Sequence, residues 1–203
     1  MTQYAASETR ATLVLASTSP RRQQLIGLLG LPVEIVPSYA DEDTPEDWRP
    51  ARIVEALAHR KASAVLDRAS QTPGAIVVGS DTIVVLDGDV LGKPKDREDA
   101  VSMLTRLAGR VHEVYTGLCC IEAASGRAVV SHSVTRVFMR ALSKDQIARY
   151  VDSGEPMDKA GAYGIQEIGA MLVERIEGDF FTVVGLPVSM LAAQLGEFGL
   201  QLP

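Results

Sequence analysis

The chain has 203 residues, of which 46% are hydrophobic and 23% are charged, and these are ordinary values for a globular protein that can bury a substantial core. Its net charge of −6 provides no general attraction to nucleic acid or to anionic membranes, so neither is expected as a partner. Residues 1–12 lack the apolar core of a signal peptide, and no apolar run approaches the length of a membrane span. We therefore expect a cytoplasmic protein.

The chain is expected to begin with a leader and to continue as one domain. Residues 1–11 are small and polar and are predicted to be flexible, while 12–203 are predicted to form a single α/β domain. A short apolar run over 13–16 indicates a buried strand. The pattern then changes to that of a helix, with Ser19 in the N-cap position and Pro20 in the first helical position.

Two arginines follow Pro20 in the first turn of this predicted helix. Arg21 and Arg22 lie at the end of the helix dipole that disfavours positive charge. Together with the hydroxyls of 17–19, which include Ser17, and the free N–H groups of the helix start, they can bind an anion such as phosphate. The alternative is that both arginines are solvated surface charges.

The next elements add an acidic loop and a lysine on an apolar face. A predicted strand over 33–36 leads to the loop Asp41-Glu42-Asp43, which alone is a weak metal-site candidate because acidic loops are usually only solvated. A helical pattern from 48 to about 68 places Lys61 on its apolar stripe. Lys61 either extends along the stripe to water or projects into a cleft and meets an anion there.

The stretch Gly79-Ser80-Asp81-Thr82 interrupts two apolar, β-branched runs, 75–78 and 83–86. Such runs are typical of a strand that is buried on both faces, or of two strands end to end. A carboxylate between them is costly unless it is paired, hydrogen-bonded or bound to a metal. The alternative is a break in the strand, at which Asp81 caps neighbouring backbone N–H groups.

The rest of the chain combines helices with strand-like stretches. After a hairpin turn at Asp87-Gly88 and a Gly/Pro loop that carries Lys93, helices are predicted at 96–107, at 146–151 and from Pro187 onward, and strands at 111–122, 128–140, 170–176 and 180–184. Alternating strands and helices, followed by hairpins, predict an α/β fold with a mixed twisted sheet bent into two lobes around a central cleft.

A segment of glycines, charged residues and one aromatic residue spans 155–166. Its glycines allow a ligand to approach the backbone. Tyr163 could stack on a base, and Gln166 can both donate to and accept from a base edge. The alternative is a surface loop of turn residues.

The two cysteines, Cys119 and Cys120, are adjacent. Neighbouring side chains on a strand point to opposite faces, so an ordinary disulfide between them is not expected. Neither cysteine has a histidine at a spacing typical of a zinc motif. We therefore assign them no role and expect both to be buried strand residues.

Several cations recur at helix starts, on an apolar face or in Gly/Pro loops, and two carboxylates are candidates to share their site. Such a set suits a polyphosphate whose charge is neutralised by Arg, Lys and a divalent cation. A carboxylate near that metal could hold it or could deprotonate an attacking water. The cations are Arg21, Arg22, Lys61, Lys93 and Lys159, and the carboxylates are Glu42 and Asp81.

Several separate motifs in the same order resemble those of the Maf family of nucleotide pyrophosphatases, over about residues 12–198. The resemblance begins at Leu15-Ala16-Ser17-Thr18-Ser19-Pro20-Arg21-Arg22 and continues through Lys61, Gly79-Ser80-Asp81-Thr82, Gly92-Lys93-Pro94, the run from Gly154 to Gln166, and Val184-Gly185-Leu186-Pro187. It implies cleavage of a nucleoside triphosphate between the α and β phosphates, with a divalent cation such as Mg²⁺, Mn²⁺ or Co²⁺. It also implies a cleft fold related to inosine-triphosphate pyrophosphatases and a homodimer.

The resemblance also implies roles for individual residues. Asp81 would be the proton acceptor that activates water, and Glu42 would assist the metal or the water, so that Glu42 and Asp81 are the metal candidates. Phosphates would be held by Ser17, Arg21, Arg22, Lys61 and Lys93. Substrate choice would depend on Arg22, Thr82 and Gln166.

The segment 158–166 resembles the dTTP/UTP branch of the family, and this implies hydrolysis of dTTP, UTP and modified pyrimidine nucleotides. The alternatives are a 7-methyl-GTP pyrophosphatase, and a nucleotide-binding regulator of cell division in which turnover is incidental. Two positions depart from the family pattern. Three adjacent carboxylates at 41–43 make the assignment of Glu42 depend on register, and Glu167 stands where many relatives have Gly, with a local effect expected.

Overall fold

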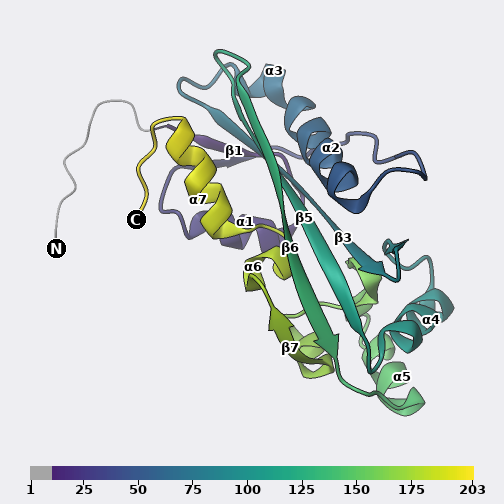
Figure 1. The fold of residues 1–203 in the computed structure, drawn as a ribbon. Helices are drawn as coiled ribbons and strands as arrows, with labels where there is room; N and C mark the ends of the chain where they lie inside the picture. The colour runs from purple at the N-terminus through teal and green to yellow at the C-terminus, as the bar shows by residue number, and fades with distance from the viewer. Residues whose placement is uncertain (1–10) are drawn as a thin grey trace.

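A single mixed sheet forms the centre of the molecule (Figure 1). The computed structural model describes residues 11–203, so the predicted leader lies almost wholly outside the described residues. Six of the seven strands in this range follow the order β2-β1-β3-β5-β6-β7, and the seventh, β4, pairs with one end of β3. β1 pairs in parallel with β2 and β3, whereas β3, β5, β6 and β7 pair antiparallel with one another in turn. The strands are β1 (Leu13–Leu15), β2 (Val33–Ile35), β3 (Ile76–Leu86), β4 (Asp89–Leu91), β5 (Val111–Glu122), β6 (Ala128–Met139) and β7 (Val173–Glu177).

Helices cover both faces of the sheet in the lobe that contains β1. On one face lie α1 (Pro20–Gly27) and α7 (Val188–Glu197), and on the other lie α2 (Pro50–Ser63) and α3 (Leu66–Ala69). Because side chains alternate along a strand, Leu13 and Leu15 pack toward α1 and α7 while Val14 packs toward α2. All three are fully buried, which explains why the β1 sequence is apolar without interruption.

A second core forms the other lobe, at the far ends of the long strands β3, β5 and β6. There α4 (Arg97–Leu107) and α5 (Lys144–Asp152) pack against side chains such as Leu86 of β3 and Val137 of β6. The predicted mixed α/β sheet with two lobes is therefore confirmed. None of the helices within residues 11–203 is long and apolar enough to cross a bilayer.

Two glycines allow α2 to lie directly on the backbone of the sheet. A Cβ added to Gly79 on β3 would lie 2.2 Å from the carbonyl oxygen of Ala58, and one added to Gly117 on β5 would lie 2.1 Å from that of Val54. Only a residue without a side chain permits this approach. The contact brings Lys61, one turn after Ala58 on α2, close to the strand that carries Asp81.

Local signals in the sequence are confirmed where they are strongest. The capping box of α5 is formed, since Ser143 Oγ accepts from Gln146 N–H at 3.2 Å and Gln146 Oε1 accepts from Ser143 N–H at 2.8 Å. The hairpin turn between β3 and β4 has positive φ at both Asp87 (54°) and Gly88 (90°), as a type I′ turn requires.

Three assignments are wrong or need new bounds. Residues 180–184, predicted as a strand from their aromatic and β-branched composition, form helix α6 (Phe180–Val184), because Asp179 caps its N-terminus and Gly185 ends it with φ 118°. The strand predicted over 170–176 starts only at β7, after the 3₁₀ helix η3 (Glu167–Leu172). The helical pattern from 48 to about 68 is divided into α2 and α3.

The cysteine prediction is confirmed. Cys119 and Cys120 are free and fully buried, and they belong to the cores on opposite faces of the sheet. Burial raises the pKa of both thiols, that of Cys119 to about 12. Both are therefore neutral at physiological pH and act as packing residues.

Candidate active site

A cleft of about 960 Å³ lies between the two lobes and brings the predicted site residues together. Its walls come from elements of both cores, including β3, α1, α2 and the loop after β4. This position agrees with the prediction of a central cleft. The nine residues to which the sequence motifs assign a role all line it: Ser17, Arg21, Arg22, Glu42, Lys61, Asp81, Thr82, Lys93 and Gln166.

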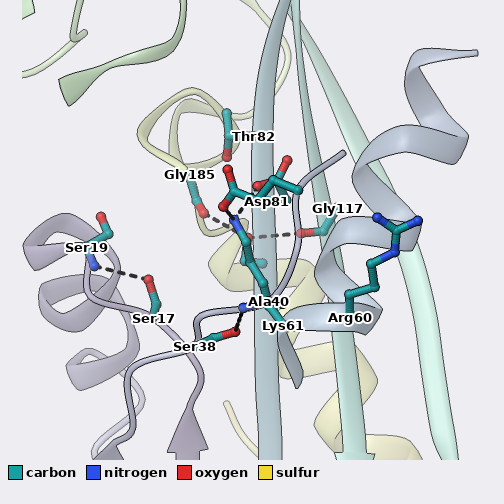
Figure 2. Close-up of polar contacts among 12 residues, drawn as sticks. Ser17, Ser19, Ser38, Ala40, Arg60, Lys61, Asp81, Thr82, Gly117 and Gly185 are labelled. Carbon is teal, nitrogen blue, oxygen red and sulfur yellow. Dashed lines mark hydrogen bonds and ion pairs between the residues drawn. The ribbon is translucent and has the colours of Figure 1, made fainter. Parts of the chain in front are cut away.

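Asp81 lies in the middle of β3, which continues through it without a break. The residue pairs with Gly117 of β5 and is 7% exposed, so the expected alternative of a strand break is wrong. Lys61 Nζ donates to Asp81 Oδ1 at 2.6 Å (Figure 2). The opposite charge and the hydrogen bond of Lys61 offset the cost of burying a carboxylate at this depth.

Glu42 reaches the same ammonium from the loop after β2. Its Oε1 lies 2.6 Å from Lys61 Nζ, so one lysine bridges two carboxylates. Burial alone would raise the pKa of Glu42, but the hydrogen bond and charge of Lys61, with the charge of Lys93, hold it below its ordinary value. Neither Asp41 nor Asp43 lines the cleft, which supports the register that selects Glu42.

The loop that carries Glu42 is attached to α2 by the residue next to Lys61. Arg60 Nη1 donates to the carbonyl oxygen of Asp43 at 2.6 Å, and Arg60 points away from Asp81 in Figure 2. Trp48, at the end of the same loop, also lines the cleft, and the centre of its ring lies 4.1 Å from the guanidinium carbon of Arg52. No sequence motif marks Trp48 as a site residue.

Arg22 is held beside β3 by two hydrogen bonds. Its Nε donates to the carbonyl oxygen of Gly185 at 2.8 Å, and its Nη2 donates to Thr82 Oγ1 at 3.1 Å. Burial lowers the pKa of Arg22, and the charge of Asp81 only partly compensates. The guanidinium remains protonated, because its ordinary pKa is far above neutrality.

The remaining cations face the cleft from three other places. Arg21 Nη1 lies 3.1 Å from Asp158 Oδ2, and Lys159 Nζ donates to Asp158 Oδ1 at 2.7 Å. Burial raises the pKa of Asp158, but these two cations together lower it below its usual range. Lys93 is exposed on the loop after β4, while Ser17 is buried and its Oγ accepts from the N–H of Ser19 at 3.1 Å.

Gln166 lines the cleft from a segment that Glu155 holds in place. The segment follows the 3₁₀ helices η1 (Glu155–Asp158) and η2 (Ala160–Ala162). Glu155 accepts from the N–H groups of Ile168 and Gly169 at 3.1 and 3.0 Å and from Tyr150 Oη at 3.0 Å. Glu155 therefore fixes the backbone on the C-terminal side of Gln166.

Glu167, the departure from the family pattern, adopts φ +54°. This left-handed conformation suits Gly and costs other residues about 1 kcal/mol or more. A Gly at this position, as in the family pattern that the sequence resembles, would adopt this conformation without strain. The strained residue directly follows Gln166, and the local effect expected of this departure stays a prediction.

Tyr163 is not available for stacking in the way that the sequence suggested. The residue is 5% exposed, and its hydroxyl lies 2.7 Å from Nε2 of the buried His112. Burial lowers the pKa of His112 to about 4. The ring of Tyr163 therefore belongs to the second core and contributes only to a wall of the cleft.

The donor set at the centre of the cleft suits a hard divalent cation. The carboxylates of Asp81 and Glu42 converge on one point, and carboxylate oxygens completed by phosphate oxygens are the ligands that Mg²⁺ and Mn²⁺ prefer. Within residues 11–203 no group of three or more His, Cys, Asp or Glu side chains forms a self-sufficient metal site. A cation there would need ligands from substrate or water.

The fold and the site together define an α/β protein whose interlobe cleft combines clustered cations with two carboxylates. The family model described as Maf-like protein matches residues 12–198. The chain belongs to this family, as the sequence motifs predicted.

Curated relatives cover nearly the whole chain. A Desulforamulus reducens protein named dTTP/UTP pyrophosphatase is 50% identical over 190 residues, which are 94% of this chain and 98% of the relative. A Moorella thermoacetica protein of the same name is 52% identical over 187 residues, 92% and 95% of the two chains. Among solved structures, the Ham1 protein of Staphylococcus aureus matches with a TM-score of 0.49 at 13% identity, covering 92% of this chain and 98% of that one.

Proposed function

We propose that the protein hydrolyses dTTP and UTP, and related modified pyrimidine nucleotides, to the nucleoside monophosphate and pyrophosphate. The names of relatives at about 50% identity over most of the chain support this activity. The observation that carries it is the placement of Asp81 on a rigid strand, 2.6 Å from Lys61 and within a cleft lined by further cations. Such a cleft can hold a polyphosphate and activate a water beside it.

In this proposal Asp81 is the proton acceptor. Its carboxylate takes a proton from a water that attacks the α phosphorus, and pyrophosphate leaves. The part of β3 that carries Asp81 is rigid because β3 is paired with β5 at Asp81 itself and with β1 a few residues earlier. Lys61 orients the carboxylate through the 2.6 Å hydrogen bond.

The cations bind the phosphates and neutralise the charge that develops on the leaving group. Lys61 and Lys93 both line the cleft, and both depress the pKa of Glu42 by their charge. Ser17, Arg21 and Arg22 form the wall at the start of α1. Removal of one donor that stabilises developing charge typically costs about two or more orders of magnitude in rate.

A divalent cation, Mg²⁺, Mn²⁺ or Co²⁺, is part of the proposal. Glu42 and Asp81 would hold it, and when bound it would supply charge neutralisation to the phosphates and increase the acidity of water. Lys61, whose ammonium contacts both carboxylates, also faces the cleft and could donate to a phosphate oxygen.

Three further features are proposed with the activity. Arg22, Thr82 and Gln166 line the cleft together and would select the base. A cytoplasmic location fits nucleoside triphosphate substrates, which are made and used there. A homodimer is proposed from the resemblance to the family, and sedimentation equilibrium gives its mass directly: a particle of 21.8 kDa would contradict it.

One assay tests the function against the two alternatives. The protein is incubated with Mg²⁺ or Mn²⁺ and a panel of dTTP, UTP, CTP, GTP and 7-methyl-GTP, and the products are separated. We expect monophosphate and pyrophosphate from dTTP and UTP. Preferential cleavage of 7-methyl-GTP would indicate the other branch, and tight binding without turnover would indicate a regulator. Release of orthophosphate alone would refute the proposed bond cleavage.

A further inference from the structure

A chain of hydroxyl groups runs from the cleft into the core beneath Arg22. Thr82 Oγ1 lies 3.1 Å from Arg22 Nη2 and 2.9 Å from Thr116 Oγ1. Thr116 Oγ1 in turn lies 2.7 Å from the carbonyl oxygen of Thr182 in α6. The two threonines are direct neighbours across β3 and β5, and Thr116 is fully buried.

The groups at the two ends of this series of hydroxyls determine which atom donates in each of its hydrogen bonds. The carbonyl of Thr182 can only accept, so the single hydroxyl proton of Thr116 points to it. The Thr116 oxygen is then the acceptor for Thr82, whose own proton points inward. At the other end the guanidinium of Arg22 can only donate, so Thr82 Oγ1 accepts from it.

The hydroxyl of Thr82 is consequently an acceptor toward the cleft. Its proton is committed to Thr116 and one lone pair to Arg22, and a second lone pair remains for a ligand. Thr82 is partly exposed and lines the cleft beside Arg22. The pair therefore offers a neighbouring donor and acceptor to whatever binds there.

We propose that Thr116 is a positioning residue that makes the site selective for a base edge with an N–H donor, the N3–H of uracil and thymine. In a pyrimidine nucleotide of this class N3–H is the only ring N–H, and it is flanked by carbonyl acceptors that suit Arg22. Cytosine presents an unprotonated N3 at the same place, so that two acceptors, cytosine N3 and Thr82 Oγ1, would face each other without a proton between them. This inference rests on the proposed function and deepens it.

Replacement of Thr116 by Val tests this relay of hydrogen bonds from Arg22 through Thr82 to Thr116. Val keeps the shape of the side chain and removes Thr116 Oγ1, the acceptor for the Thr82 hydroxyl. The Thr82 hydroxyl can then rotate and donate to cytosine N3. We expect the ratio of kcat/KM for UTP to that for CTP to fall by roughly tenfold or more in Thr116→Val. Thr116→Ser, which keeps the hydroxyl, should restore the wild-type ratio.

Thr135→Val is the matched control. Thr135 is also a fully buried threonine, on β6, and it exchanges hydrogen bonds of 2.9 Å with the backbone of Asp179 at the start of α6. Its loss removes buried hydrogen bonds near the same helix without touching Thr82. We expect this variant to keep the wild-type preference for UTP, whatever its thermal stability.

Binding of monophosphates provides a readout that does not depend on turnover. Calorimetric titration of the wild-type protein should give a tighter Kd for UMP than for CMP, and N3-methyl-UMP, which lacks the N–H, should bind as weakly as CMP. Tight binding of N3-methyl-UMP, or an unchanged UTP-to-CTP ratio in a folded Thr116→Val variant, would overturn the proposal. Absence of pyrophosphate release would instead refute the proposed function and leave the UMP comparison as the test of the relay.

Discussion

Replacement of Gly79 by Ala should damage the active site through the packing of α2 on the sheet. The added Cβ would lie 2.2 Å from the carbonyl oxygen of Ala58, and 2.8 Å from the amide nitrogen of Ala62. Ordinary contacts of this kind begin at about 3.4 Å, so α2 must move away from β3 by roughly 1 Å. Backbone atoms are on both sides of the contact, so no side-chain rotation can relieve it.

The cost follows from that displacement. Overpacking of this size destabilises a core by about 1–3 kcal/mol, which for a chain of this length lowers Tm by roughly 3–10 °C. Lys61 follows Ala58 by one turn of α2, so its ammonium moves with the helix and the 2.6 Å contact with Asp81 is lost. A misplacement of about 1 Å at a reacting centre costs on the order of 100-fold in rate.

Thermal denaturation and initial rates of pyrophosphate release, taken well below the Tm of the variant, measure the two effects separately. Gly196→Ala is the control, because Gly196 lies in α7, a Cβ added there would have no atom within 4 Å, and a helix favours Ala. It should keep full activity and equal or higher Tm. Wild-type Tm and rate in Gly79→Ala would refute the close packing of α2 and the dependence of Lys61 on it.

Three further predictions concern single residues. Asp81→Asn should lower kcat by about 10²–10⁴-fold while circular dichroism stays native, since the amide keeps the shape and can still accept from Lys61; near-normal kcat would exclude the role of proton acceptor. Burial lowers the pKa of His112 to about 4, so the unfolded state takes up a proton at a higher pH than the folded state does. The free energy of unfolding should therefore fall as pH is lowered from about 6.5 toward 4, by on the order of 3 kcal/mol in all. Urea denaturation across this pH range should show that the free energy of unfolding falls less steeply with pH in His112→Gln than in wild type. Equal slopes of this free energy against pH would contradict a buried neutral histidine. Glu167→Gly should raise stability by up to about 1 kcal/mol, or roughly 2–4 °C in Tm, by relieving φ +54°; a lower Tm by calorimetry would show that the Glu side chain compensates the strain.

The sequence predicts those parts of the fold whose signals are local. The apolar runs of β1 and β3 and the capping box of Ser143 and Gln146 all identify their elements, because periodicity and capping act within a few residues. The segment 180–184 shows the limit of composition. Its β-branched and aromatic residues favour a strand, but the cap by Asp179 and the burial of Thr182 and Val184 override that preference.

The sequence predicts the candidate site as a set of residues, but it does not predict their contacts. Its motifs single out both Lys61 and Asp81, yet nothing in them shows that one ammonium bridges Asp81 and Glu42, because the three come from separate elements. Thr116 has no signal of its own, since a Thr in a strand is ordinary. Its importance arises from register: it faces Thr82 across the sheet.

The continuity of β3 through both lobes has a mechanical consequence. β3 and β5 remain paired from Ile76 to Val85, across the level of Asp81, and β5 and β6 are paired over a similar length. Rotation of one lobe against the other would bend these three paired strands or break their hydrogen bonds. Hinge motions of domains instead use loops and the ends of elements. Asp81 is thus mounted at a fixed point of the sheet, and we expect any adjustment of the cleft to a ligand to occur in the loops that line it.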